Sequence, residues 1–306
     1  TIEILEKSKI KISELFLVAS EKSEGKKIKF RGNEIQIQSL EKYDFSNSQI
    51  TFFAAGSKIA EKWVPKASKK TVVIDNSKFF RMDKDVPLIV PEVNLDKLAM
   101  YKKKNIIANP NCSTIQMVVA LKPLHDQFKI KRVIVSTYQS VSGAGKAPMD
   151  ELVNQSKDFL AGKKINSENF TKQIAFNLIP HIDEFVEEGY TKEEWKMVNE
   201  TKKILDPKIK LTATCVRVPV MVSHAESINV EFEKSFDIEK VKQILNKSEG
   251  CKVIDERKNG GYITPLEAEN SYMTFISRIR KDTSNDKALN MWVVSDNLLK
   301  GAALNT

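Results

Sequence analysis

The stretch Asn105–Gln116, NIIANPNCSTIQ, decides the fold of this chain because it predicts a turn from a strand into a helix. Residues 105–108 are typical of a short buried strand, and Pro110 stops it. From Thr114 to His125, apolar residues recur at helical spacing. Cys112 therefore lies in or just before a first helical turn, where unpaired backbone N–H groups favour an anion. The pattern predicts a nucleophilic thiolate, and a small core cysteine is the alternative.

Strands and helices alternate in the first third of the chain. Four short runs rich in β-branched and aromatic residues are predicted as strands, and helical stretches lie between several of them: residues 14–19, 50–54, 71–75 and 88–90. This alternation is typical of a parallel, doubly wound sheet, so the predicted fold class is α/β.

Beyond the turn the predicted strands become longer and more often consecutive. They are residues 132–139, 210–220, 227–233, 272–280 and 288–295, which indicates a mixed or antiparallel sheet with helices on one face. We therefore expect a cofactor-binding domain of residues 1–111, completed by 301–306, and a second domain of residues 112–300. Cys112 then lies at the crevice between the domains, where ligands of such folds bind.

Composition and charge exclude several classes of protein. A chain of 306 residues with 41% apolar content can bury a large core. It has no apolar run long enough to cross a membrane and no signal-peptide pattern. The three cysteines lack the spacing of a zinc site or a disulfide scaffold, so no metal is expected and a free thiol suits the reducing cytoplasm.

The net charge of +9, from 49 basic and 40 acidic residues, would attract anionic substrates. The lysines are scattered and no nucleic-acid-binding motif accompanies them, so neither nucleic acid nor a membrane is an expected partner.

Five segments in this order resemble the active-site segments of the aspartate-semialdehyde dehydrogenase family: residues 109–116, 137–145, 193–205, 217–227 and 292–303. The resemblance implies a Rossmann-like doubly wound sheet with an α+β catalytic and dimerisation domain, NADP as cofactor, and a cytoplasmic homodimer. It also implies the reductive dephosphorylation of L-aspartyl 4-phosphate to L-aspartate 4-semialdehyde, a step toward diaminopimelate, lysine, threonine and methionine.

The resemblance assigns the catalytic residues. Cys112 would attack the acyl phosphate and form a thioester, and Gln139 would orient the acyl group. His224 would take a proton from the thiol and return it to the departing thiolate. A structural role is the alternative for any lone histidine. His125, on the helix after the nucleophile, is expected to face solvent.

The same resemblance assigns the substrate-binding residues. Arg217 lies on an otherwise uncharged strand and would clamp the α-carboxylate of the substrate, with an ion pair to a protein carboxylate as the alternative. Glu193 would hold the amino group, and it shares a helix face with Lys196. An ordinary surface Glu–Lys pair is the alternative there. The phosphate would be bound by Arg81, Asn111 and Lys196.

For the cofactor, Ser20, Lys22 and Ser23 follow the first predicted strand and match the family's NADP-reading loop. NADP sites offer hydroxyls and cations where NAD sites place an acid, and Glu21 departs locally from that pattern. The resemblance adds further cofactor contacts at Ala55, Gly56, Ser142, Gly143 and Asn297.

The glycine-rich turn that cradles a cofactor pyrophosphate is not in this sequence. Residues 1–7 resemble the end of the helix that follows this turn, and residues 305–306 lie inside what resembles the family's last helix. We therefore expect the parent protein to be longer, with a further central strand beside residues 14–19.

Two other functions stay open. N-acetyl-γ-glutamyl-phosphate reductase shares the acyl-phosphate chemistry, but the segments around Cys112, Glu193 and Arg217 fit it poorly. A non-catalytic scaffold relative that keeps the fold would show broken chemistry, whereas the four residues Cys112, Gln139, Arg217 and His224 are all present.

Overall fold

The computed structural model describes all residues, Thr1 to Thr306, and they form two compact units. The first unit comprises residues 1–87, 98–109 and 306, and the second comprises 88–97 and 110–305. Residues 88–97 and 301–305 thus group with the second unit by their contacts. The functional boundaries expected from the sequence stay a prediction.

The first unit contains a parallel three-stranded sheet in the order β4-β5-β6. Its strands are β4 (Ile50–Phe53), β5 (Val72–Asp75) and β6 (Ile106–Ala108), which confirms three predicted strands to within one or two residues. Helix α2 (Ser57–Ala67) packs on β4 and β5 through the buried side chains of Trp63 and Val64.

A second three-stranded sheet of the first unit has the order β1-β3-β2. It consists of β1 (Leu17–Ala19), β2 (Lys27–Phe30) and β3 (Asn33–Ser39), with β1 parallel and β2 antiparallel to β3. Arg31 and Gly32 join β2 to β3 with φ of 47° and 83°, the left-handed pair that a tight hairpin requires. The three residues of β1 are only partly buried, and β1 pairs with no strand other than β3.

The predicted strand at residues 88–90 does not form, and only Leu88 within it makes a single β-bridge. Pro87 and Pro91 flank this apolar run, and Pro91 begins the short helix α3 (Pro91–Asn94). The side chain of Asn94 accepts a hydrogen bond from Val90 N and donates one to Leu88 O, each over 2.9 Å. A side chain therefore satisfies the backbone groups that a neighbouring strand would otherwise pair.

The second unit is built on a six-stranded mixed sheet in the order β10-β11-β12-β9-β7-β8. Strands β7 and β8 are parallel, β9 is antiparallel to β7, and β12 is antiparallel to both β9 and β11. The strands are β7 (Ile130–Gln139), β8 (Lys210–Arg217), β9 (His224–Phe232), β10 (Cys251–Val253), β11 (Thr274–Asp282) and β12 (Asn285–Ser295). This arrangement confirms the predicted mixed sheet.

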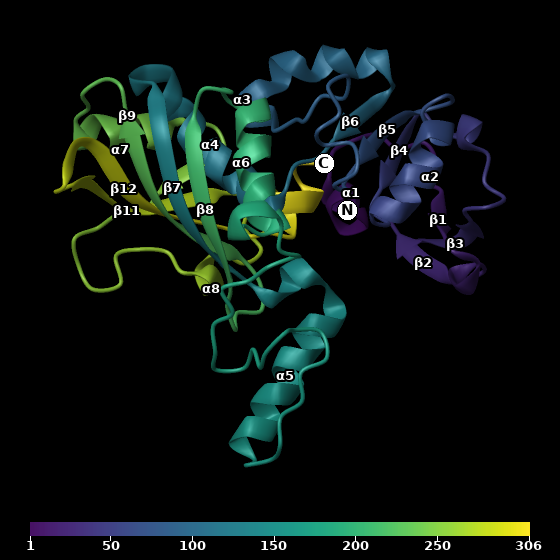
Figure 1. Cartoon of the computed structure of the whole chain (residues 1–306). Coiled ribbons are helices and arrows are strands. Elements are labelled where there is room, and N and C mark those ends of the chain that lie inside the picture. The colour runs from purple at the N-terminus through teal and green to yellow at the C-terminus, as the bar shows by residue number, and fades with distance from the viewer. The chain divides into compact units, whose positions relative to one another are not determined.

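Three long helices of the second unit contact the sheet (Figure 1), and the short helix α8 (Pro265–Ala268) contacts β12. Helix α4 (Cys112–Phe128) packs against β7, β9, β11 and β12, while α6 (Lys192–Ile204) packs against β8. Helix α7 (Ile238–Lys247) covers β10 and β11. Helix α5 (Lys146–Leu160) extends away from the sheet in Figure 1.

The remaining elements are short: α1 (Ile2–Lys7), α8 (Pro265–Ala268), the 3-10 turns η1 (Glu21–Ser23), η2 (Phe45–Asn47), η3 (Leu95–Lys103), η4 (Val141–Ala144) and η5 (Glu187–Gly189), and the π-helical η6 (Leu299–Ala303). None of the helices combines the length and the apolar character needed to cross a bilayer.

The register of the large sheet places several of the predicted site residues next to one another. Gln139 pairs with Arg217 on β8 and with His224 on β9, and His224 pairs with Ser295 on β12. These four residues therefore form one row across the sheet, where β7 and β8 end and β9 begins. Because side chains alternate between faces, the residues two positions along form a second row on the same face.

Candidate active site

Cys112 is the first residue of α4, as predicted, and it is partly exposed. The helix begins there because Asn111 caps it. The Asn111 Oδ1 atom accepts hydrogen bonds from Ser113 N over 3.0 Å and Thr114 N over 3.2 Å. The thiol therefore lies at the positive end of a helix of 17 residues.

Helix α6 holds Asn111 from the other side. The backbone N–H of Asn111 donates to Oε2 of Glu200 over 2.6 Å, and its side-chain amide donates to Oε1 of Glu193 over 2.8 Å. Glu193 and Glu200 lie two helical turns apart on one face of α6. The nucleophile's cap is thus fixed by two buried carboxylates, of which the sequence had identified only Glu193.

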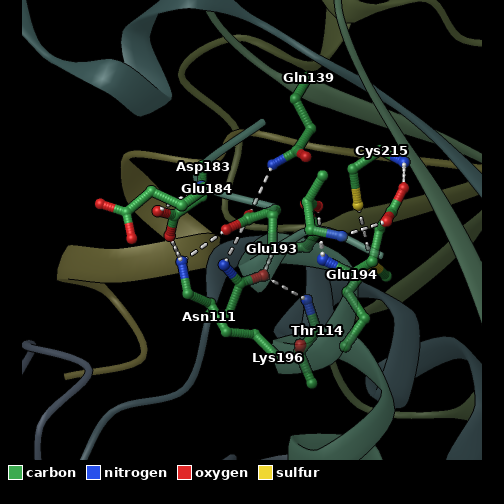
Figure 2. A network of polar contacts seen from close by, with 12 residues as sticks. Asn111, Thr114, Gln139, Asp183, Glu184, Glu193, Glu194, Lys196 and Cys215 are labelled. Atoms are coloured by element: carbon green, nitrogen blue, oxygen red, sulfur yellow. Dashed lines mark hydrogen bonds and ion pairs between the residues drawn. The ribbon is translucent and has the colours of Figure 1, made fainter. Parts of the chain in front are cut away.

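Glu193 is the centre of a polar network (Figure 2). Its Oε1 also accepts a hydrogen bond from Gln139 Nε2 over 3.1 Å, and its Oε2 accepts one from Lys196 Nζ over 2.8 Å. Burial alone would raise the pKa of Glu193, but Lys196 and the hydrogen bonds from Gln139 and Asn111 lower it to about 2. Glu193 is therefore an ionised carboxylate at neutral pH.

Lys196 lies between two carboxylates, because its Nζ also contacts Oδ2 of Asp183 over 2.8 Å. Burial lowers the pKa of Lys196, but Glu193 and Asp183 outweigh it and raise the pKa. Asp183 belongs to a loop with a left-handed backbone, at φ 67°. The sequence did not identify this residue, because nothing in a lone aspartate on a loop shows which lysine it will contact.

Arg217 ends β8 and is 7% exposed. Its Nη1 donates to Ser140 O over 2.7 Å, and no carboxylate lies within 4.0 Å of its guanidinium. Burial lowers its pKa, while Glu193 and Cys112 act in the other direction. Arginine keeps its proton in proteins, so a nearly buried positive charge stands near the thiol without a paired anion. The alternative of a protein ion pair is wrong.

His224 begins β9 and is fully buried. Its Nδ1 accepts a hydrogen bond from the backbone N–H of Ser140 over 3.0 Å, and Ser140 Oγ lies 3.1 Å from the same atom. Its Nε2 has no hydrogen-bond partner. Burial, followed by the charge of Arg217, lowers the pKa of His224 to about 3, so the ring is neutral at neutral pH.

The turn η4 after β7 approaches His224 and Arg217 closely at Gly143. A Cβ atom on Gly143 would lie 3.1 Å from His224 Nε2 and 3.2 Å from Arg217 Nη1. Asn297 ties this turn to the strand of the histidine, because its Oδ1 accepts from Ser223 N over 2.9 Å and from Ser142 Oγ over 3.2 Å. The second unit therefore gathers these predicted residues in one place.

A second glycine makes room for the nucleophile. Gly301 lies in the π-helical η6, and a Cβ atom there would lie 2.8 Å from the Cβ of Cys112. The sequence assigned this segment to a cofactor contact and gave no sign of its contact with the thiol residue.

The first unit holds the other predicted cofactor residues. Ser20 and Lys22 are exposed at η1, and neither side chain has a hydrogen-bond or ion-pair partner. Ala55 is exposed before Gly56, which caps α2 with φ 83° and has open space where a Cβ would lie. The hydroxyl of Ser20 and the ammonium of Lys22 can bind a phosphate group, and so can the open N-terminus of α2. These groups suit a phosphorylated cofactor. Ser23 completes η1 and is partly exposed.

Arg81 also lies in the first unit and is 9% exposed. Its guanidinium donates to Ser77 O over 3.1 Å and to Asn76 O over 3.2 Å. Its predicted place in a phosphate site with Lys196 stays a prediction.

The expectation that His125 faces solvent is wrong. It is 8% exposed, and its Nδ1 accepts a hydrogen bond from Ile130 N over 3.1 Å. The short connection from α4 to β7 folds back over the ring, a tertiary contact that helical spacing alone does not indicate.

The chain matches two family descriptions: "Semialdehyde dehydrogenase, NAD binding domain" over residues 1–101 and "Semialdehyde dehydrogenase, dimerisation domain" over residues 121–300. Aspartate-semialdehyde dehydrogenase of Aquifex aeolicus is 51% identical over 308 residues, which span 99% of this chain and 91% of that protein.

Two solved structures are also similar. Aspartate semialdehyde dehydrogenase II of Vibrio cholerae, complexed with ASA, superposes with a TM-score of 0.97 at 46% identity over 99% of this chain and 90% of that one. The Candida albicans enzyme with NADP gives a TM-score of 0.70 at 27% identity over 95% and 88% of the two chains. This chain belongs to the aspartate-semialdehyde dehydrogenase family.

Proposed function

We propose that this protein catalyses the NADPH-dependent reductive dephosphorylation of L-aspartyl 4-phosphate to L-aspartate 4-semialdehyde, in the biosynthesis of diaminopimelate and the aspartate-derived amino acids. The observation that carries the proposal is the nearly buried Arg217, which has no protein carboxylate and lies close enough to act on Cys112. A buried cation without a protein counter-ion is costly, and an anionic ligand that binds beside the thiol would compensate its charge. A substrate with an α-carboxylate provides one.

Cys112 attacks the acyl carbon of the acyl phosphate, the bond from this carbon to the phosphate oxygen breaks, and phosphate leaves as the thioester forms. NADPH supplies the hydride that reduces the thioester carbon. Cys112 then departs as a thiolate, and the aldehyde is released. The start of α4 stabilises the thiolate at both stages, because its first N–H groups have no partner within the helix.

His224 supplies the proton-handling group. Its Nε2 is buried, has no partner, and lies beside Gly143 and Arg217. A negative oxygen develops on the acyl carbon during attack, and a hydrogen-bond donor aimed at it lowers the barrier. Gln139, in the same row of the sheet, orients the acyl group.

Different charged residues bind different groups of the substrate. Arg217 binds the α-carboxylate through two parallel hydrogen bonds, and Glu193 binds the amino group. Lys196, Asn111 and Arg81 bind the phosphate. In the structure Lys196 contacts Glu193 and Asp183, so phosphate binding at Lys196 requires it to exchange a contact with Asp183.

The cofactor residues are assigned by their chemistry. Lys22 and the hydroxyls of Ser20 and Ser23 recognise the 2′-phosphate that distinguishes NADP from NAD. Ala55 and Gly56 at the start of α2 bind the dinucleotide, as do Ser142, Gly143 and Asn297 in the second unit. Residues 1–111 with 301–306 form the NADP-binding domain, and 112–300 form the catalytic and dimerisation domain.

We further assign a homodimer through the second domain and a place in the cytoplasm, where the reducing conditions protect the thiol of Cys112. Equilibrium sedimentation of the purified protein tests the dimer, and a monomer at micromolar concentration contradicts it.

The activity is tested by following NADPH formation from aspartate semialdehyde, NADP and phosphate with the purified protein. We expect activity that requires phosphate and is lost in Cys112→Ser. N-acetyl-glutamate semialdehyde is the control substrate for the alternative reductase, and faster turnover of it would contradict the proposal. A scaffold protein would turn over neither aldehyde, and its Cys112 would not form an acyl adduct visible by mass spectrometry.

A further inference from the structure

We propose that Glu226 is a neutral carboxylic acid that, together with Gln116, fixes the position of His224 relative to the helix that carries Cys112. Glu226 is thus a positioning residue for the reaction, and its role in catalysis rests on the proposed function. Nothing in the mechanism above uses either side chain.

Glu226 lies in the middle of the sheet, directly behind the catalytic row. It pairs with Thr137 on β7 and with Val293 on β12, and it is two residues after His224 on the same face of β9. The residue is fully buried. The Gln116 amide interacts with the Glu226 carboxyl, but neither carboxyl oxygen makes a hydrogen bond of ordinary geometry, and no cation forms an ion pair with it. An ionised carboxylate in this place would carry a large desolvation penalty with no compensating contact.

Gln116 lies across from it on α4, one helical turn after Cys112 and therefore on the same face of the helix. Its Nε2 donates to the backbone carbonyl of His224 over 3.3 Å. Its Oε1 is buried and has no hydrogen-bond donor. The unpaired atoms on the two side chains are all acceptors, so a proton on Glu226 gives Gln116 Oε1 the donor that it lacks.

The surroundings of Glu226 favour the protonated form. Burial raises the pKa of Glu226 well above its ordinary value, and the Gln116 amide opposes this only in part. Two titratable groups lie near it: Cys215 on β8, in the same row of the sheet, and His224, two residues earlier on its own strand. Cys215 is a thiol and His224 is neutral, so neither supplies a positive charge.

The result is a line of three groups: the Glu226 carboxyl, the Gln116 amide and the His224 carbonyl. It joins the strand that carries the histidine to the helix that carries the thiol. Because Gln116 is the one side chain that bonds this carbonyl across the two elements, the orientation of its amide sets their separation. Ionisation of Glu226 would attract the Nε2–H group of Gln116 and so draw the amide away from the His224 carbonyl.

The protonation state is tested by difference infrared spectroscopy of the wild-type protein against Glu226→Gln. We expect a carbonyl band of a protonated, weakly hydrated carboxylic acid at neutral pH, which shifts in ²H₂O and is missing in the variant. Glu231→Gln is the matched control, because Glu231 lies on the same strand, faces out and pairs with Lys131. A wild-type spectrum without this band overturns the proposal whether or not the enzyme is active.

Stability gives an independent readout. The unfolded chain releases the Glu226 proton above the ordinary value near 4.5, whereas the folded chain keeps it. The unfolded state therefore binds fewer protons, and folding loses stability as pH rises above that value. The wild type should therefore lose stability as pH rises, whereas Glu226→Gln should not. We expect the free energy of unfolding of the variant, relative to that of the wild type, to increase with pH. A difference that stays constant from acid to neutral pH contradicts the proposal.

Kinetic measurements on two variants distinguish a positioning role of Glu226 from a role in packing alone. Glu226→Gln still donates to Gln116 Oε1, so its kcat should stay within about threefold of wild type. Glu226→Leu leaves that atom buried and unpaired, and we expect kcat to fall about tenfold with KM nearly unchanged. Circular dichroism checks that both variants fold. Equal kcat in the two variants overturns the donor role, and so does a Glu226→Leu enzyme with wild-type kcat.

Discussion

The backbone N–H of Ser140 donates a hydrogen bond to Nδ1 of His224 over 3.0 Å, and this contact decides what the histidine can do. A ring nitrogen that accepts a hydrogen bond carries no proton, so the neutral imidazole has its proton on Nε2. Nε2 is the atom without a protein partner. The neutral ring therefore presents a donor to the site. The expectation that His224 first takes the thiol proton would require the other tautomer.

The first prediction concerns this tautomer. We expect the ¹⁵N chemical shifts of His224 to show a protonated Nε2 and a bare Nδ1 that stay constant between about pH 5 and pH 8, because the pKa of His224 is lowered to about 3. The variant His224→Gln assigns the signals. A ring that gains its second proton in this interval contradicts the structure.

The lowered pKa of His224 also makes the stability of the protein depend on pH. The unfolded chain protonates His224 below its ordinary pKa near 6.5, whereas the folded chain stays neutral until about pH 3. The unfolded state therefore binds more protons in this window, and stability falls as pH decreases through it. His224→Gln should lose less stability than the wild type over the same change in pH, as urea titrations at several pH values would measure.

The role of Ser140 shows a limit of reading function from residue types. Its contribution is a backbone N–H, which every residue except proline has, so the sequence could not single it out. Arg217 is the opposite case. Its alternation with Cys215 along β8 predicted a charge on the buried face, and the structure places it there. Side-chain periodicity is local, whereas the pairing of Ser140 with His224 depends on strand register.

Glu200 lies between these cases. It follows Glu193 by seven residues and Lys196 by four, so helical spacing puts all three on one face of α6. The sequence therefore contained a signal that Glu200 faces the site. What it lacked was the partner: the backbone N–H of Asn111 is 89 residues away. The failed strand at residues 88–90 has a related cause, since short apolar runs do not reveal which groups will pair with them.

The second prediction concerns Arg217. Replacing it by Met removes the expected carboxylate ligand, so KM for aspartate semialdehyde should rise about a hundredfold. Because no protein carboxylate pairs with the guanidinium, its removal leaves no orphaned charge, and the free energy of unfolding should not fall. Arg132→Met, on the exposed side of β7, is the control. A large loss of stability in Arg217→Met would show that a structural partner exists.

The third prediction concerns Gly301. A methyl group there would lie 2.8 Å from the Cβ of Cys112, closer than real Cβ contacts come. We expect Gly301→Ala to displace the thiol, so that kcat and the rate of Cys112 alkylation by iodoacetamide both fall about tenfold or more. The neighbouring Ala302→Ser, which is partly exposed, should leave both rates near wild type. Wild-type alkylation in Gly301→Ala would mean that η6 yields to the methyl group at no cost to the site.

The fourth prediction concerns what holds η6 in place. Lys300 is 1% exposed, and its Nζ donates to Oε1 of Glu92 over 2.5 Å. Removing one member of a buried ion pair leaves the other charge without compensation, so Lys300→Met and Glu92→Gln should each lower the free energy of unfolding by about 3–5 kcal/mol. The double variant should lose clearly less than the sum, because no charge is then left unpaired.

The exposed pair of Lys122 and Asp126 on α4 is the matched control for this cycle. Its removal should change the free energy of unfolding by less than about 1 kcal/mol. Since Lys300 adjoins Gly301, loss of the Glu92 contact should also slow alkylation of Cys112, whereas loss of the control pair should not. If the two single variants and the double variant lose stability additively, the pair does not act as a unit, and η6 is held instead by the side-chain carboxylate of Asp296, whose Oδ1 accepts hydrogen bonds from the backbone N–H groups of Leu298 and Leu299.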